Sequence, residues 1–240
     1  MILAILQARV SSTRLPGKVL KDLHGQPMIL RQIERLKRST KMDEFVVATS
    51  TESSDDPLVE VLEQAGVSVR RGPLDDVAAR FAMVIDEFHP DVVVRLTADC
   101  PLTDAAVIDS IIDSHLSSGA DYSSNTLEPT FPHGLDAEVF SPQAFARLRA
   151  TEMSSKEIEH VTYGLYSRKG EFTLNSVTQP VNVRHLRWTV DNPEDLDFVR
   201  EVYDRLYDSN PAFTQQDVLD LLEREPELVF TEELDARKAR

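Results

Sequence analysis

The sequence has little cysteine and a deficit of positive charge. Its 240 residues include one cysteine, Cys100, which excludes a disulfide framework or a cysteine-based zinc site within one chain. Lys and Arg together number 26 against 41 Asp and Glu, so the formal net charge is −15. This charge opposes approach to nucleic acid or to an anionic membrane, and we expect neither as a partner. An anionic ligand would have to meet a local cluster of cations.

Long hydrophobic runs are also missing. No apolar run approaches the roughly 20 residues needed to cross a bilayer, and Ile2–Leu6 is too short for the apolar part of a secretion signal. We therefore expect a cytoplasmic protein. Hydrophobic residues make up 41% of the chain, which is ample for the core of a domain of this length.

In the first half, short apolar runs alternate with helical patterns. This alternation predicts an α/β fold with a mostly parallel central sheet and helices on both faces. The expected strands are Ile2–Leu6, Phe45–Ala48, Val67–Arg70 and Asp91–Leu96. The expected helices include Pro27–Arg38 and Asp104–Ser118. Another expected helix is capped by Asp56, begins at Pro57 and ends at Gly66. The last is Asp75–Phe88, for which Asp75 and Asp76 are candidate caps.

The second half is less regular. Its expected strands are Asp121–Asn125, Asp136–Phe140, Phe172–Val177 and Leu186–Val190, and its expected helices are Pro142–Ala150, Ser155–Arg168, Pro193–Tyr207 and Thr214–Glu223. The end, Thr231–Arg240, is highly charged and reads as a solvated helix or a frayed tail. Without repeats or a low-complexity linker, the simplest interpretation is a single domain over residues 1–240.

The loop after the first strand concentrates cations in this acidic chain. Arg9, Arg14 and Lys18 stand among Ser11, Ser12 and Thr13. In a doubly wound sheet, ligands bind beyond the carboxyl ends of the strands, which is where this loop lies. Arg and Lys suit phosphate oxygens, although no Walker loop is present. A solvated basic loop is the alternative.

Two aspartates also follow expected strands. Asp99 comes after the strand ending at Leu96, and Asp191 follows the strand ending at Val190. Carboxylates at a shared sheet edge suit Mg²⁺, which proteins hold with one or two carboxylates plus substrate phosphates. From spacing alone, Asp99 could equally be a turn residue and Asp191 a cap of the helix that Pro193 opens.

With these residues in view, the chain resembles the sugar nucleotidyltransferases, above all the cytidylyltransferase branch that includes CMP-Kdo synthetase and the SpsF group. The resemblance is carried by "QARVSSTRLPGK" (Gln7–Lys18), "TADCP", "HGLDAEVF", "EHVT" and "DNPEDL", and extends to about Tyr207. It implies a GT-A-like fold and Mg²⁺-dependent transfer of CMP from CTP to a small-molecule acceptor such as a sugar acid, by a homodimer. It divides the chain into a nucleotide-binding half (1–119), an acceptor-binding and dimerisation half (120–207) and a C-terminal part (208–240).

The resemblance also implies roles for individual residues. Arg14, Lys18 and Asp99 would be catalytic, and Asp99 and Asp191 would hold Mg²⁺. The nucleotide would contact Leu6, Gln7, Ala8, Arg9, Arg14 and Lys18.

Three residues of the second half are candidates for the acceptor. Asp136 and Glu138 alternate on one face of an expected strand, where they could meet the acceptor or face solvent. His160, within "EHVT", could touch the acceptor or make a structural hydrogen bond. Arg80 could add to an anion pocket, but a surface role is the expectation. We read Trp188 as a core residue and Cys100 as a small packing residue.

Two other functions compete with this interpretation. One is a sugar nucleotidyltransferase with another base, or a glycosyltransferase of the same fold, although "TADC" lacks the expected D-x-D. The other is a nucleotide-binding protein without turnover, which fold alone does not exclude.

Overall fold

The first strand of the protein supplies hydrophobic side chains to both faces of a central sheet. In the computed structural model, which describes residues 1–231, β1 (Ile2–Gln7) alternates between two core clusters. Leu3 and Ile5 belong to one cluster, whereas Ala4 and Leu6 belong to the other, and all four are fully buried. A strand buried on both sides requires helices above and below it.

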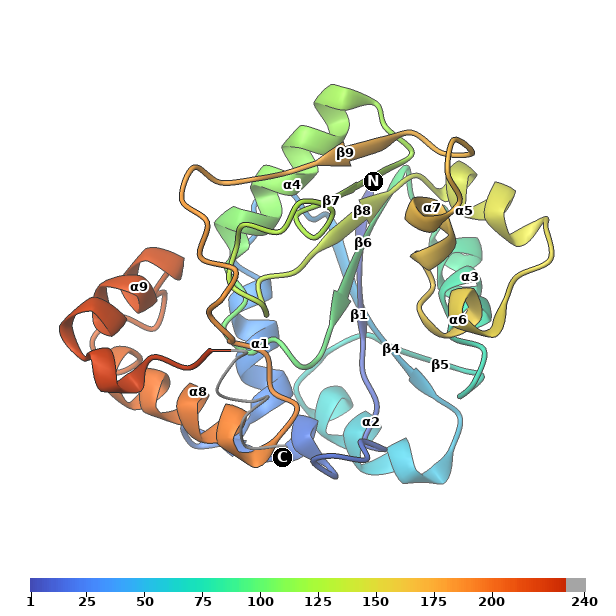
Figure 1. Ribbon diagram of the computed structural model, residues 1–240. Helices are drawn as coiled ribbons and strands as arrows, with labels where there is room; N and C mark the ends of the chain where they lie inside the picture. The colour runs from blue at the N-terminus through green and yellow to red at the C-terminus, as the bar shows by residue number, and fades with distance from the viewer. Residues whose placement is uncertain (232–240) are drawn as a thin grey trace.

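Within the described residues the sheet has seven strands, and one of them runs against the others. Its order is β5 (Val69–Gly72), β4 (Glu44–Ser50), β1, β6 (Val92–Thr97), β8 (Glu138–Phe140), β7 (Tyr122–Ser124) and β9 (Leu174–Ser176). β8 pairs antiparallel with β6 and β7, and every other pairing is parallel. The α/β fold with a mostly parallel sheet is therefore confirmed (Figure 1).

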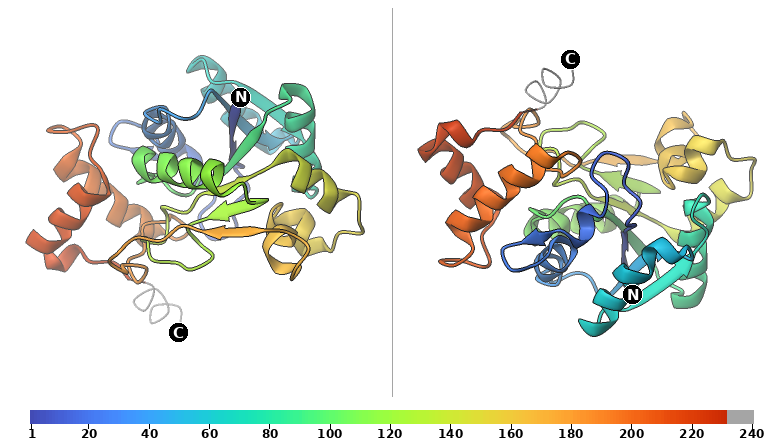
Figure 2. Two further views of the ribbon diagram at one scale, coloured as in Figure 1. Left: turned by 90° about the horizontal axis from the view of Figure 1, so that it is seen from above. Right: turned by 90° about the horizontal axis from the view of Figure 1, so that it is seen from below.

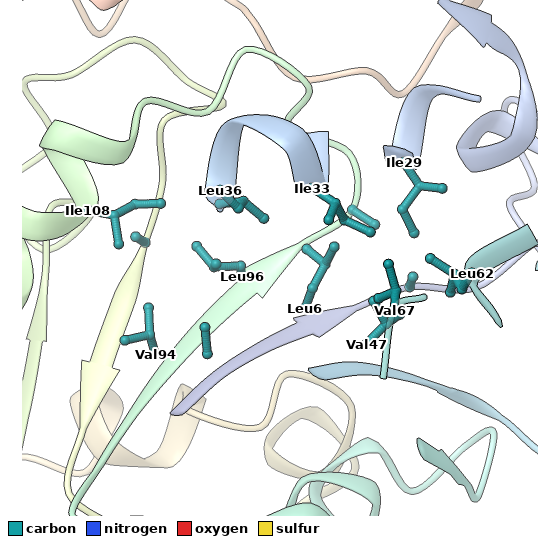
Figure 3. Close-up of a cluster of buried hydrophobic side chains, with 14 of the residues drawn as sticks. Leu6, Ile29, Ile33, Leu36, Val47, Leu62, Val67, Val94, Leu96 and Ile108 are labelled. Atoms are coloured by element: carbon teal, nitrogen blue, oxygen red, sulfur yellow. The ribbon is translucent and has the colours of Figure 1, made fainter. Parts of the chain in front are cut away.

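Helices cover both faces of the sheet (Figure 2). One face carries α1 (Met28–Leu36), α2 (Asp56–Gln64) and α4 (Ala105–Ser118), whose apolar residues pack on β1, β4 and β6 (Figure 3). The other face carries α3 (Val77–Phe88), α5 (Pro142–Arg149), α6 (Ser155–Glu159) and α7 (Tyr163–Ser167). Within residues 1–231, no helix has the length and apolar character to cross a membrane.

A third core lies beside the sheet. It is built by α8 (Pro193–Leu206) and α9 (Gln215–Arg224), which Figure 1 shows grouped at one side of the molecule. Trp188 is fully buried in this core, as predicted. Short elements complete the chain: the hairpin β2 (Asp22–Leu23) and β3 (Gln26–Pro27), which was not predicted, and the 3-10 turns η1 (Lys18–Leu20), η2 (Ser53–Asp55) and η3 (Pro226–Leu228).

Two predicted elements of the second half are wrong. Leu186–Val190 is not a strand of the sheet, and within residues 1–231 it makes only isolated bridges, from Leu186 to Thr231 and from Arg187 to His133. The helix predicted over Ser155–Arg168 is broken into α6 and α7, because Val161 has a positive φ of 52° that an α-helix cannot contain.

Two smaller predictions also fail, and one holds. Asp56 is the first residue of α2 rather than its cap, and Arg80 is buried and donates to the carbonyls of Pro73 and Leu74 instead of facing solvent. Asp76 does cap α3, since its side chain accepts from Ala79 N. The charged tail was predicted over residues 231–240, and all but its first residue lie outside the described part of the chain.

Candidate active site

The loop after β1 is folded back on itself at the carboxyl edge of the sheet. Gly17 has a φ of 68°, a left-handed conformation that glycine adopts without strain, and its N–H donates to the carbonyl of Val10 at 3.1 Å. The N–H of Val10 in turn donates to the carboxylate of Asp55 at 2.7 Å. Asp55 is fully buried and also accepts from Thr49 and Ser50. It therefore anchors the start of the loop.

Lys18, at the end of this loop, points toward the two aspartates. Its ammonium donates to the backbone carbonyl of Val190 at 2.7 Å and to Asp191 Oδ1 at 3.0 Å, and it lies 3.6 Å from Asp99 Oδ2. The structure thus brings together the three residues on which the sequence interpretation depends, from distant parts of the chain.

Asp191 is surrounded by cations. Besides Lys18, Arg14 Nη2 lies 3.0 Å from Oδ1, and Arg187 Nη2 lies 3.1 Å from Oδ2. Burial by itself would raise the pKa of Asp191, but these cations, Lys18 above all, outweigh it and hold the pKa below its ordinary value. The ionised form of Asp191 is therefore favoured, and both of its carboxylate oxygens are paired with these cations.

A buried ion pair fixes the backbone at Asp191. Arg187 donates from Nε and Nη2 to both carboxylate oxygens of Asp195, at 2.9 and 3.0 Å. Asp195 Oδ2 also accepts from the N–H groups of Asp191 and Asn192, at 2.7 and 2.8 Å. The turn that presents Asp191 is thus held by one carboxylate.

Asp99 is tied to the same turn through its backbone. Its carbonyl accepts from Val190 N at 2.7 Å and from the hydroxyl of Thr189 at 3.2 Å. Its side chain accepts from the hydroxyl of Thr97 at 2.6 Å. The adjacent Cys100 is buried, and burial raises the pKa of its thiol well above the ordinary value, which fits the packing role predicted for it.

A cavity of about 350 Å³ opens between this loop, the ends of β1 and β6, and the junction of α6 with α7. Its lining residues are Gln7, Ala8, Arg9, Ser12, Thr13, Arg14, Lys18, Val77, Arg95, Thr97, Ala98, Asp99, Glu159, His160 and Asp191. Arg9, Val77 and Glu159 also line a second cavity of about 440 Å³, which therefore adjoins the first.

Most residues expected at the nucleotide line the first cavity. Gln7, Ala8, Arg9, Arg14 and Lys18 do so, whereas the side chain of Leu6 lies in the core between the sheet and α1. Thr97, Arg95 and Val77 were not singled out from the sequence. The sequence does distinguish two of them, because Arg95 and Thr97 are polar residues in an otherwise apolar strand. They are two positions apart, so they lie on the same face of that strand.

The three residues expected at the acceptor lie in different surroundings. His160 lines the cavity. Glu138 is held by an ion pair with Arg95 and by the hydroxyls of Tyr122 and Thr162, at 2.7 and 2.6 Å. Asp136 pairs with Arg184 at 2.7 Å, and burial raises its pKa.

The acidic residues of the site suit a hard divalent cation that also contacts substrate. Within residues 1–231, no three His, Cys, Asp or Glu side chains form a ready-made metal cage. Asp99 and Asp191 do face one point, since a single ammonium reaches both. Two carboxylates completed by phosphate oxygens and water are a usual arrangement for Mg²⁺.

Comparison with known proteins places this geometry in a family. The family model described as "Cytidylyltransferase" matches residues 3–223. The spore coat polysaccharide biosynthesis protein SpsF of Bacillus subtilis is 31% identical over 241 residues, covering 98% of this chain and 99% of the relative.

Two solved structures share the fold. A cytidylyltransferase from Leptospira borgpetersenii aligns with a TM-score of 0.90 at 27% identity, over 95% of this chain and 96% of that one. CMP:2-keto-3-deoxy-manno-octonic acid synthetase, solved with CTP, aligns with a TM-score of 0.63 at 16% identity, over 85% and 98% of the two chains. The match to the family model and the alignment to SpsF each span almost all of the chain. The chain therefore belongs to the cytidylyltransferase family and is a nucleotidyltransferase.

Proposed function

We propose that the protein transfers CMP from CTP to a sugar acid or a related precursor of a surface polysaccharide, with release of pyrophosphate and with Mg²⁺ as cofactor. The observation that carries this proposal is the meeting of Arg14 and Lys18 with Asp99 and Asp191 at one edge of the sheet. Cations for phosphates and carboxylates for metal are both needed in phosphoryl transfer. The name of SpsF supports the polysaccharide context, and the CTP complex of a fold relative supports the donor.

In this reaction a hydroxyl oxygen of the acceptor attacks the α-phosphorus of CTP, the bond to the pyrophosphate oxygen breaks, and the hydroxyl proton is released. Lys18 and Arg14 would turn from Asp191 to the β- and γ-phosphates and neutralise the leaving group. Asp99 and Asp191 would hold Mg²⁺, whose charge would offset that of the phosphate oxygens when bound.

The walls of the cavity would hold the two substrates. The backbone of Gln7 and Ala8, with Arg9, would line the nucleotide site next to the phosphate-binding loop. His160 also lines this cavity and is the candidate for direct contact with the acceptor, because Asp136 and Glu138 are not among the lining residues. Assembly as a homodimer belongs to the same proposal and is tested by sedimentation.

The experiment has two arms. Thermal unfolding with Mg²⁺ and CTP, UTP, GTP or ATP in turn should show the largest stabilisation with CTP, because a ligand that binds only the folded state raises its stability. Pyrophosphate release from CTP with a panel of sugar acids should then identify the acceptor. Equal stabilisation by CTP and ATP would contradict the base assignment, and the absence of pyrophosphate release with every acceptor would contradict the acceptor class.

A further inference from the structure

A row of polar side chains runs across the buried part of the sheet and ends at the cavity. Arg95 on β6 and Glu138 on β8 are register partners, and Arg95 Nη1 pairs with Glu138 Oε2. Both side chains are almost buried, at 11% and 13% exposure. The other oxygen of Glu138 accepts from the hydroxyls of Tyr122 and Thr162. These contacts hold the guanidinium of Arg95 in one place.

Arg95 in turn fixes the orientation of Gln7. Its Nη2 lies 3.2 Å from Gln7 Oε1. A guanidinium only donates hydrogen bonds, so the carbonyl oxygen of the Gln7 amide must face it and the NH₂ group must point elsewhere. Within the described part of the chain, that NH₂ group donates to no other residue, and Gln7 lines the cavity. The backbone of Gln7 is also fixed, because its carbonyl accepts from Ala98 N at 3.0 Å.

We propose that the side-chain amide of Gln7 is a fixed hydrogen-bond donor to the nucleoside part of CTP, and that Arg95, held by Glu138, is the residue that positions it. This proposal rests on the proposed function. Gln7 directly precedes Ala8 and Arg9, where the phosphate-binding loop begins, so a nucleotide held by the loop lies next to it. Glu138 acts in this scheme through Arg95 and not by touching a substrate.

The neutral NH₂ group of Gln7 suits the nucleoside better than the charged parts of either substrate. Phosphates are met by Arg14 and Lys18, and a sugar carboxylate would call for a free cation. Arg95, the cation that contacts the Gln7 amide, is already paired with Glu138. A neutral NH₂ group suits a neutral acceptor atom such as a base carbonyl or a ribose hydroxyl.

Isothermal titration calorimetry with CTP·Mg²⁺ and with tripolyphosphate·Mg²⁺ tests the role of Gln7. Gln7→Leu should weaken CTP binding by about three- to tenfold, the usual range for one hydrogen bond, and leave tripolyphosphate binding unchanged. Gln7→Glu keeps a partner for Arg95 but presents an acceptor to the nucleoside, and should weaken CTP binding further. Gln143→Glu, an exposed residue of α5, makes the same charge change away from the cavity and should bind both ligands as the parent does.

The role of Arg95 is tested by coupling. Arg95→Met combined with Glu138→Leu removes both members of the buried pair together, which avoids an unpaired buried charge. This variant should lose CTP affinity to about the same extent as Gln7→Leu, and adding Gln7→Leu to it should cause little further loss, because the two changes act on one interaction. A merely structural role of the pair would give additive losses.

The outcomes separate the two proposals. If the parent does not bind CTP, the proposed function is overturned and this inference with it. If the parent binds CTP but the Gln7 variants bind it equally well, or lose tripolyphosphate affinity to the same extent, the inference alone is wrong. The inference is also wrong if the Gln7 variants bind CTP normally and only their KM for the acceptor substrate rises. The Gln7 amide would then donate to the acceptor substrate.

Discussion

Lys18 and Asp191 are separated by 173 positions in the chain, yet Lys18 Nζ lies 3.0 Å from Asp191 Oδ1. The same nitrogen lies 3.6 Å from Asp99 Oδ2. The two carboxylate oxygens therefore cannot be farther apart than the sum of these distances. That keeps them below the roughly 8 Å beyond which two carboxylates could not share one Mg²⁺ directly or through a bridging water. This geometry supports the assignment of both aspartates to one metal site.

The contact of Lys18 leads to the first prediction. Lys18→Ala removes a charged donor and should weaken CTP·Mg²⁺ binding by about ten- to a hundredfold, corresponding to roughly 1.5–3 kcal/mol. Isothermal titration calorimetry measures the change. Lys21→Ala is the matched control, because Lys21 follows the same loop without lining the cavity, and it should bind CTP normally. Unchanged affinity in Lys18→Ala would show that the loop does not hold the triphosphate.

The carboxylates lead to the second prediction. Asp99→Asn preserves the shape of the side chain but removes its charge. The variant should fold, lose most of the additional thermal stabilisation that Mg²⁺ gives in the presence of CTP, and lose most pyrophosphate release. Asp197→Asn, an exposed residue of α8, serves as control. A Mg²⁺ response in Asp99→Asn equal to that of the parent would exclude Asp99 as a metal ligand.

The sequence predicted the sheet and the place of the basic loop at its edge, because both depend on local patterns. Apolar strands, helix caps and the cluster of cations after β1 are visible within short windows. The neighbourhood of Asp99 and Asp191 was inferred correctly, but partly for a wrong reason. Leu186–Val190 is not a strand, and Asp191 reaches the site because Val190 N donates to the carbonyl of Asp99.

Long-range polar contacts account for what the sequence did not predict. Asp55 holds the start of the loop through Val10, 45 positions away, and nothing in its local sequence distinguishes it from Asp56. Likewise, "KEIEHVT" has a helical pattern, and the break at Val161 is produced by tertiary packing, since that side chain is fully buried in the core. Such residues are recognised only when their partners are known.

The third prediction concerns how protein stability depends on pH at α6, the short helix that precedes His160. Glu157 completes the capping box of α6 with Ser154 and pairs with Arg168. The hydrogen bond with Arg168 is the main cause that lowers the pKa of Glu157 from 4.5 to about 2. Because the pKa is lower in the folded state, this carboxylate contributes stability above pH 4.5 that is lost as the pH falls toward 2.

Glu157→Gln tests this dependence. The variant should unfold at a lower urea concentration than the parent at pH 7, and the difference should shrink between pH 4.5 and 2. Glu159→Gln changes the same charge on the same short helix, but Glu159 is exposed and makes no cap contact, so its unfolding should follow the parent. A stability difference for Glu157→Gln that stays constant over this pH range would contradict the assignment.

The fourth prediction concerns the buried pair behind Asp191. Asp195 is fully buried, receives two hydrogen bonds from Arg187 and holds the N–H groups of Asp191 and Asn192. Asp195→Ala leaves the Arg187 guanidinium buried without this partner and releases the turn. The free energy of unfolding should fall by about 3–5 kcal/mol, and CTP·Mg²⁺ binding should weaken because Asp191 is no longer held.

Two further variants separate the ion pair of Asp195 with Arg187 from the hydrogen bonds that Asp195 accepts from Asp191 and Asn192. Asp197→Ala removes an exposed carboxylate from the same helix and should change the free energy of unfolding by at most about 0.5 kcal/mol. Arg187→Met combined with Asp195→Leu removes both buried charges, so it should recover part of the stability lost in Asp195→Ala. It should not recover CTP binding, because the N–H groups of Asp191 and Asn192 still lack the carboxylate that positions them. Urea unfolding and calorimetry on the same preparations measure both quantities, and recovery of the two together would show that Asp195 matters only as the partner of Arg187.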